Sequence, residues 1–187
     1  MRVRHFPFLL ALGALAGCET TSIINTDADM YSVKEATAPL KSGARIALVN
    51  GYSQEAKTEI GSQAGNHFVL DLRQATDTAI AMTSRHLQTM GVAADANAEK
   101  KMTLRVTNAR TALQLKPFTF DSRFRTSLNI AAECEGRQNT TAFAENAAVL
   151  APMMSHESTV KRGVEGATMF AVTKLLNDPR VVDCINR

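Results

Sequence analysis

The sequence predicts an α+β fold, a two-layer sandwich in which a mixed or antiparallel sheet carries two helices on one face. Three observations lead to this prediction. Residues 70–90 and 158–177 repeat apolar side chains at helical spacing, and residues 101–115 alternate apolar with polar side chains. The order of the expected elements, strand, helix, three strands, helix, is typical of such a sandwich.

The first strand is expected at Arg45–Asn50, a compact apolar run between Gly43 and Gly51. Such a run is typical of a strand that is buried on both faces, so we expect it near the centre of the sheet. Residues 51–66 are polar, which indicates a long loop that could hold a short hairpin.

The first helix is expected over Leu70–Met90, because its apolar side chains recur three or four positions apart and Gly91 follows at a usual C-cap position. The second helix is expected over Ser158–Asn177. Gly163 and Gly166 lie inside it, and each costs a helix about 1 kcal/mol relative to alanine. We therefore expect a strand or the other helix to approach closely at these two positions.

Three strands are expected between the helices. Lys101–Leu115 has the two-residue period of a half-buried strand. From Phe118 onwards apolar side chains occupy even positions, and this parity points Cys134 inward. Residues 136–139 form a turn, and residues 140–148 form a weaker strand that pairs back antiparallel.

The amino terminus has the three parts of a secretory signal. Arg2 and Arg4 are basic, Phe6–Ala14 is apolar but too short to span a bilayer, and Leu15-Ala16-Gly17-Cys18 ends in a cysteine. This succession resembles the lipobox of bacterial lipoproteins. The resemblance implies cleavage before Cys18, diacylglycerol on its sulfur and acylation of the new amino terminus. The alternative is an ordinary cleaved signal followed by a chance cysteine.

These features divide the chain into a signal peptide at residues 1–17, a lipidated tether at residues 18–44 and a periplasmic α+β domain at residues 45–187. A flexible tether of this length spans roughly 28 Å. Glu19 follows the cysteine, and by the same resemblance this favours the periplasmic face of the outer membrane. The expected membrane contact is the lipid on Cys18, since several acyl chains on one cysteine hold a protein far more firmly than one.

Composition excludes several classes of protein. Without the signal, 170 residues remain, with 19 basic and 18 acidic side chains, so the pI of about 8.9 overstates the basic character. There is no basic stripe with interleaved aromatic residues, and we expect no nucleic-acid partner. The three histidines at 67, 86 and 156 lack the spacing of metal ligands, and we expect neither a metal nor a cofactor.

Two cysteines remain once Cys18 carries lipid. Because exported proteins meet an oxidising compartment, we expect Cys134 and Cys184 to form a disulfide. A closed loop of about 51 residues would stabilise the fold by about 4 kcal/mol. The alternative is two buried free thiols, since free cysteine also packs well among apolar side chains.

No arrangement of residues suggests catalysis. Gly61-Ser62-Gln63-Ala64-Gly65 lacks the spacing of a nucleophile elbow and is expected to be a turn. We therefore predict a protein that is not an enzyme and that acts as a binding or assembly factor in the bacterial cell envelope. Two alternatives stay open: an enzyme acting on envelope material, and a purely structural lipoprotein.

The lipobox, the tether and the order of elements together resemble small outer-membrane lipoproteins of the YajG type. More distantly, they resemble the lipoprotein plug of lipopolysaccharide transport and the outer-membrane activators of peptidoglycan synthases. The resemblance implies a contact with an envelope protein or polymer. The long loop at residues 51–66 is the candidate contact, through Tyr52, Glu55, Lys57 and Glu59, and the alternative is a connection without any ligand.

Overall fold

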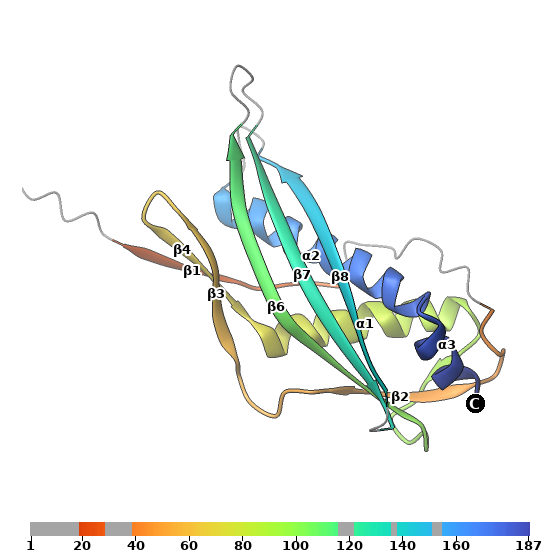
Figure 1. The fold of residues 1–187 in the computed structure, drawn as a ribbon. Coiled ribbons are helices and arrows are strands. Elements are labelled where there is room, and N and C mark those ends of the chain that lie inside the picture. The colour runs from red at the N-terminus through yellow and green to blue at the C-terminus, as the bar shows by residue number, and fades with distance from the viewer. Residues whose placement is uncertain (1–18, 29–38, 116–121, 136–137, 151–154) are drawn as a thin grey trace, which may run out of the picture.

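The computed structural model describes residues 19–28, 39–115, 122–135, 138–150 and 155–187 (Figure 1). Its elements, in chain order, are β1 (Thr20–Ile24), β2 (Arg45–Asn50), β3 (Lys57–Gln63), β4 (Asn66–Asp71), α1 (Leu72–Thr89), β5 (Ala93–Ala94), β6 (Lys101–Leu115), β7 (Ser122–Cys134), β8 (Gln138–Val149), α2 (His156–Leu176) and α3 (Pro179–Asn186).

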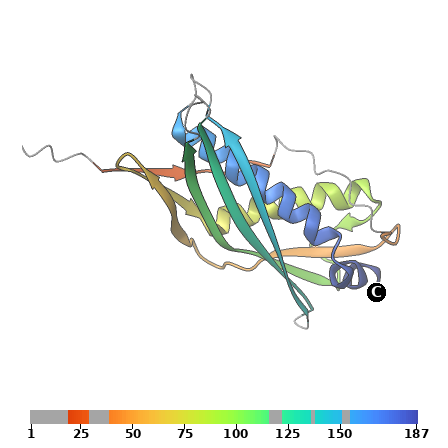
Figure 2. The ribbon, with the colours of Figure 1, turned by 45° about the horizontal axis from the view of Figure 1, so that its top comes forward.

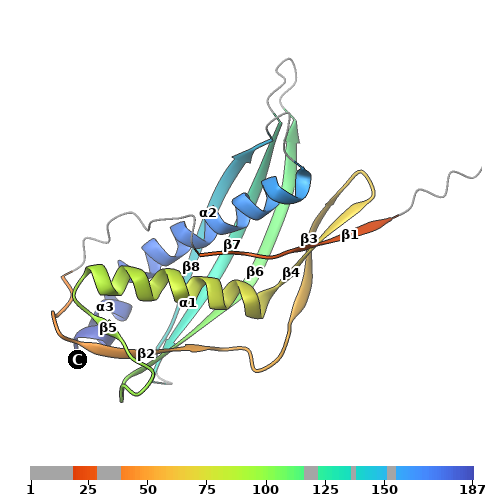
Figure 3. The ribbon, with the colours of Figure 1, turned by 180° about the vertical axis from the view of Figure 1, so that it is seen from behind.

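The main layer is a five-stranded sheet in the order β5-β2-β6-β7-β8. Strand β2 is parallel to both of its neighbours, whereas β6, β7 and β8 form an antiparallel meander, so the sheet is mixed. Helices α1 and α2 lie behind these strands in Figure 1 and in front of them in Figure 3. The predicted two-layer α+β sandwich is confirmed.

Side-chain parity builds the core between the sheet and the helices. On β6 and β7 the buried side chains occupy alternate positions, as expected of strands with one covered face. A bulge on β6 between Val106 and Asn108 moves the inward parity from even to odd numbers, so Ala109 continues the buried row. The largest fully buried side chains include Phe68, Phe124 and Leu128.

The strand at Arg45–Asn50 differs from its prediction in position and burial. It lies between β5 and β6, next to the sheet edge instead of at the centre. Ile46 and Ala47 are buried, but Val49 is 38% exposed. Val49 points to the face of the sheet away from α1, whereas the next residue, Asn50, still reaches α1, where its side-chain amide donates to the Arg73 carbonyl and to Asp77 Oδ1.

A second, three-stranded sheet in the order β1-β4-β3 replaces much of the expected loop at residues 51–66. The hairpin between β3 and β4 turns at Ala64 and Gly65, whose φ angles are +51° and +79°. Two consecutive positive φ angles are typical of a tight hairpin turn, which glycine adopts without strain. The turn predicted within residues 61–65 is therefore confirmed, and only residues 51–56 remain as a loop.

The segment expected to be a coiled tether is partly a strand. Thr20–Ile24 pairs in parallel with β4, and Ile24 and Ala28 are buried in the core. The Thr26 and Thr78 hydroxyl oxygens lie 2.8 Å apart, which joins this segment to α1. The random-coil span of roughly 28 Å therefore does not apply to residues 20–28.

Both glycines of α2 face the sheet, as expected. A Cβ atom at Gly163 would lie 2.5 Å from Thr126 Oγ1, and one at Gly166 would overlap the amide of Asn146. These contacts bring the helix backbone against β7 and β8. Figure 2 shows α2 running along the back of these two strands.

Candidate functional site

The residues that would carry the lipid lie outside the described part of the chain. Cys18 and the lipobox Leu15–Gly17 belong to residues 1–18, so the anchor stays a prediction. Within the described ranges, no helix is long and apolar enough to cross a membrane.

Cys134 and Cys184 meet in the structure as a disulfide, with Cα atoms 6.3 Å apart. Cys184 lies on α3, not in an irregular tail, and that helix also buries Val181 and Ile185 against the core. The bond thus joins the end of β7 to the last helix. The pairing is the one expected from the cysteine count, and its presence in native protein is tested below.

Tyr52 was expected to be free to contact a partner, but its side chain packs within the fold. Its hydroxyl donates to the Val106 carbonyl oxygen at 2.7 Å, and the Arg105 guanidinium lies 5.4 Å from the centre of its ring. Partial burial raises the pKa of the Tyr52 hydroxyl, against the opposing effect of the Arg105 charge. Together these contacts hold the 51–56 loop against β6.

Glu55 and Lys57 form an exposed ion pair, with Lys57 Nζ 2.9 Å from Glu55 Oε1. The hydrogen bond to Glu55 raises the pKa of Lys57. Both side chains line a polar hollow of about 620 Å³ at the start of α1, together with Ile23, Asn25, Asp71, Arg73, Gln74 and Asp77. The Asp71 carboxylate already accepts from the Arg73 backbone N–H there, so it caps the helix terminus itself.

Glu59 points to a different place. Its Oε1 lies 3.0 Å from His67 Nδ1 on the neighbouring strand, and this hydrogen bond raises the pKa of His67. The four candidate residues therefore occupy three separate surroundings and do not form one site. A test that replaces residues 53–63 by a flexible linker would be suitable if they formed a loop. In this structure it would remove strand β3 and its buried Ile60.

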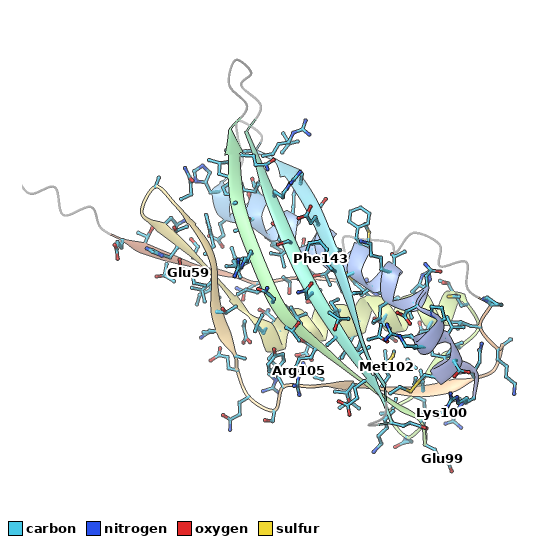
Figure 4. All side chains as sticks on the ribbon, in the orientation of Figure 1. Glu59, Glu99, Lys100, Met102, Arg105 and Phe143 are labelled. Carbon is cyan, nitrogen blue, oxygen red and sulfur yellow. A yellow bond between two sulfur atoms is a disulfide. The ribbon has the colours of Figure 1, made fainter. Side chains whose placement is uncertain are left out.

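A larger surface feature was missed by the sequence reasoning. The described helices cover one face of the five-stranded sheet, and the outward side chains of β6, β7 and β8 whose burial is described are exposed or half-buried. Figure 4 labels Arg105 and Phe143 on two of these strands. The outward positions carry five basic side chains against two acidic ones: Lys101, Arg105, Arg110, Arg123 and Arg125 against Glu133 and Glu145. Parity could have revealed Lys101, Arg105, Arg123 and Arg125, but not Arg110, which faces outward only because the bulge shifts the parity of β6.

A groove of about 420 Å³ lies where this open face meets β3. Arg110 on β6 and Arg125 on β7 line it with Ser127, and Arg110 lies directly opposite Ser127 in the register. Both arginines are exposed, and neither forms an ion pair with a described residue. Glu59, Ile60, Gly61, Thr111, Ala112 and Glu145 complete the lining. The groove thus offers two guanidinium groups to an anionic partner.

One buried carboxyl group lies on the opposite, helical side. Glu165 on α2 is 1% exposed, and its Oε1 accepts from the Asp27 backbone N–H at 2.8 Å. Its Oε2 has no hydrogen-bond partner among the described residues. Burial raises the pKa of Glu165, although Lys161, 3.7 Å away, acts in the other direction.

Within the same described ranges, no group of three or more histidine, cysteine or acidic side chains could hold a metal ion.

Comparison with known proteins adds information about the fold. No family model matches the sequence, and no curated protein is similar to it in sequence. Among solved structures, protein XCC0632 from Xanthomonas campestris, described with the family model DUF330, superimposes with a TM-score of 0.52 at 12% identity. The match covers 88% of this chain and 96% of the Xanthomonas protein.

Two further structures superimpose less closely. A minor lipoprotein from Acinetobacter baumannii has a TM-score of 0.38 at 12% identity over 75% of this chain and 94% of its own. Rare lipoprotein B from Shewanella oneidensis has a TM-score of 0.39 at 9% identity over 74% and 98% of the two chains. At such identities a shared fold carries no function with it. The comparison supports one statement, that this chain has the fold of the Xanthomonas protein along most of its length.

Proposed function

We propose that this chain is a lipid-anchored lipoprotein of the bacterial envelope, held at the outer membrane, that binds an acidic partner protein on its open sheet face and catalyses no reaction. The observation that carries the proposal is the groove with Arg110 and Arg125. The two guanidinium groups project from adjacent strands without an ion-pair partner among the described residues, and this arrangement suits the carboxylates of an acidic partner.

Charge distribution supports an acidic partner. The chain without its signal is nearly neutral, yet the open face has an excess of three basic side chains. Such a concentration steers an oppositely charged partner towards one face and speeds its association. Because Arg110 and Arg125 project from strands, a partner can be bound without first ordering a flexible loop.

Site-specific crosslinking tests this binding. A photoreactive amino acid at Ala112, which lines the groove, is compared in intact cells with the same group at Gln88, an exposed residue of α1. We expect an adduct from Ala112 whose crosslinked peptide is rich in aspartate and glutamate. Arg110→Glu should reduce its yield at least about tenfold, whereas Lys41→Glu, on an exposed lysine outside the face, should not. Equal adducts from both positions, or an adduct insensitive to Arg110→Glu, would contradict the proposal.

The anchor is tested separately. Growth with a labelled fatty acid should label the full chain, and Cys18→Ser should abolish the label and release the protein from the membrane fraction. Neither Cys134 nor Cys184 follows a signal-like run, so neither can replace Cys18. Retention of label on the variant would refute lipid attachment at Cys18 and leave the groove test unaffected.

A further inference from the structure

Among the described strands, β8 ends the five-stranded sheet and has a neighbour, β7, on one side only. The Glu135 backbone N–H donates to the Lys101 carbonyl at 3.1 Å, so odd-numbered residues of β7 face β6 and even-numbered ones face β8. Odd-numbered residues of β8 therefore turn their backbone N–H and C=O groups outward. Lys174 Nζ, which donates to the Phe143 carbonyl at 2.8 Å, agrees with this direction.

This edge lacks the usual protection against pairing. Phe143 and Val149 are each 50% exposed, and Glu145 is the one charged residue of the strand. The strand contains no proline or lysine, and its pairing with β7 shows no bulge. A long, regular edge with apolar side chains is a template for a further strand.

We infer that β8 pairs antiparallel with the β8 of a second copy of this chain, with Phe143 opposite the partner's Val149 and Glu145 opposite the partner's Ala147. All these residues turn their backbone groups outward, so each opposed pair exchanges two hydrogen bonds. In the same register Phe143 of each copy lies beside Val149 of the other on the open face, and such pairs of aromatic and β-branched side chains stabilise neighbouring strands.

Charge complementarity selects this register. Arg125 lies opposite Ala147 within its own sheet, and in the pair the partner's Glu145 continues the same row. The two Cα atoms are then about 10 Å apart across one alanine, a distance that the two long side chains bridge. A shift that placed Glu145 opposite the partner's Glu145 would instead set like charges directly against each other.

Lys174 is the competing group. Its amine occupies the Phe143 carbonyl, which in the pair accepts from the partner's Val149 N–H. The lysine is exposed and must release this bond when the strands meet. Removing the lysine should therefore strengthen the pairing of the two strands.

Native mass spectrometry of the full chain in detergent, up to about 50 µM, tests the inference. We expect a dimer that Glu145→Arg and Arg125→Glu each weaken at least about tenfold and that the double charge reversal restores. Lys174→Met should strengthen it. Ala147→Pro should abolish it, because proline removes an outward N–H and leaves the bonds to β7 in place.

Glu133→Arg is the matched control, since Glu133 lies on the same face but on β7 and outside the proposed pairing. Circular dichroism of each variant checks that it is folded. A chain that is monomeric over the whole range overturns the inference, as does a dimer that tolerates both single charge reversals. Lys174→Met and Ala147→Pro change no residue that lines the groove, and native mass spectrometry of the purified chain contains no acidic partner protein. The outcome is therefore distinguishable from that of the groove experiment.

Discussion

Gly163→Ala should destabilise the protein although alanine is the better helix former. Gly163 lies in the middle of α2 and faces β7, where an added Cβ would stand 2.5 Å from Thr126 Oγ1 and 3.3 Å from Thr126 Cβ. Thr126 is fully buried, and its hydroxyl oxygen lies 3.2 Å from that of Thr111. The threonine therefore cannot move aside without losing that hydrogen bond.

The magnitude follows from three contributions. Replacing a helical glycine by alanine gains about 1 kcal/mol. Forcing an extra carbon into a packed site costs about 1–3 kcal/mol, and breaking the Thr111–Thr126 hydrogen bond costs about 1 kcal/mol. The free energy of unfolding should therefore fall by about 1–3 kcal/mol, which lowers the melting temperature by about 2–12 °C in a protein of this size.

Urea unfolding of the full chain in detergent, followed by circular dichroism, measures this change. Gly166→Ala is the control, because the atom it would meet is the amide end of the Asn146 side chain, which can rotate away; we expect a change below about 1 kcal/mol. In a Thr126→Ala background the hydroxyl oxygen is gone and only the Cβ atom at 3.3 Å remains, so Gly163→Ala should there change the free energy of unfolding by less than about 1 kcal/mol. A stabilising Gly163→Ala in the native sequence, or an unchanged loss in the Thr126→Ala background, would refute the packing argument.

Three other predictions concern covalent, electrostatic and hydrogen-bonding contacts. Non-reducing mass spectrometry should find the peptides of Cys134 and Cys184 joined, and reduction should lower stability by about 4 kcal/mol without changing the fold; two freely alkylated thiols would refute the bond. The raised pKa of Glu165 means that the folded state holds its proton more tightly than the unfolded chain, so this group makes the protein most stable below its unfolded pKa and less stable as pH rises through the folded pKa. Glu165→Gln should flatten that part of the stability profile, measured by urea unfolding from pH 4 to pH 8, and an unchanged slope would contradict the assignment. Tyr52→Phe should cost about 1 kcal/mol by removing the bond to the Val106 carbonyl, and a change of zero would show that the 51–56 loop is held by its other contacts.

Much of the fold could be predicted because the relevant signals are local. The period of two in Lys101–Leu115 gave β6 its bounds, and Gly91 after α1 has the positive φ of +78° that a helix end requires. Gly163 and Gly166 indicate from the sequence alone that another element approaches the helix closely, and in the structure these elements are β7 and β8. In each case the pattern and its physical cause lie within a few residues of each other.

The small sheet could not be predicted in the same way. Thr20–Ile24 is polar at its start and becomes a strand through its pairing with β4, some 46 positions away, as in Thr20 with Asn66. Residues 57–63 contain one buried side chain, Ile60, so their alternation is weak. The groove was missed because Arg110 and Arg125 come together only through the bulge of β6 and its register with β7.

Strand β1 also sets how an anchored molecule would stand on a bilayer. Its first residue, Thr20, donates its N–H to the Gly65 carbonyl at 3.0 Å, and Glu19 is the single residue between it and Cys18. The lipidated sulfur would then be joined to a hydrogen-bonded strand by about 7 Å of backbone. A lipid on Cys18 would therefore hold the Ala64–Gly65 turn close to the headgroups and would limit how far the molecule can tilt. Inserting a Gly-Ser spacer after Glu19 would replace this short link by a flexible linker and leave the fold intact.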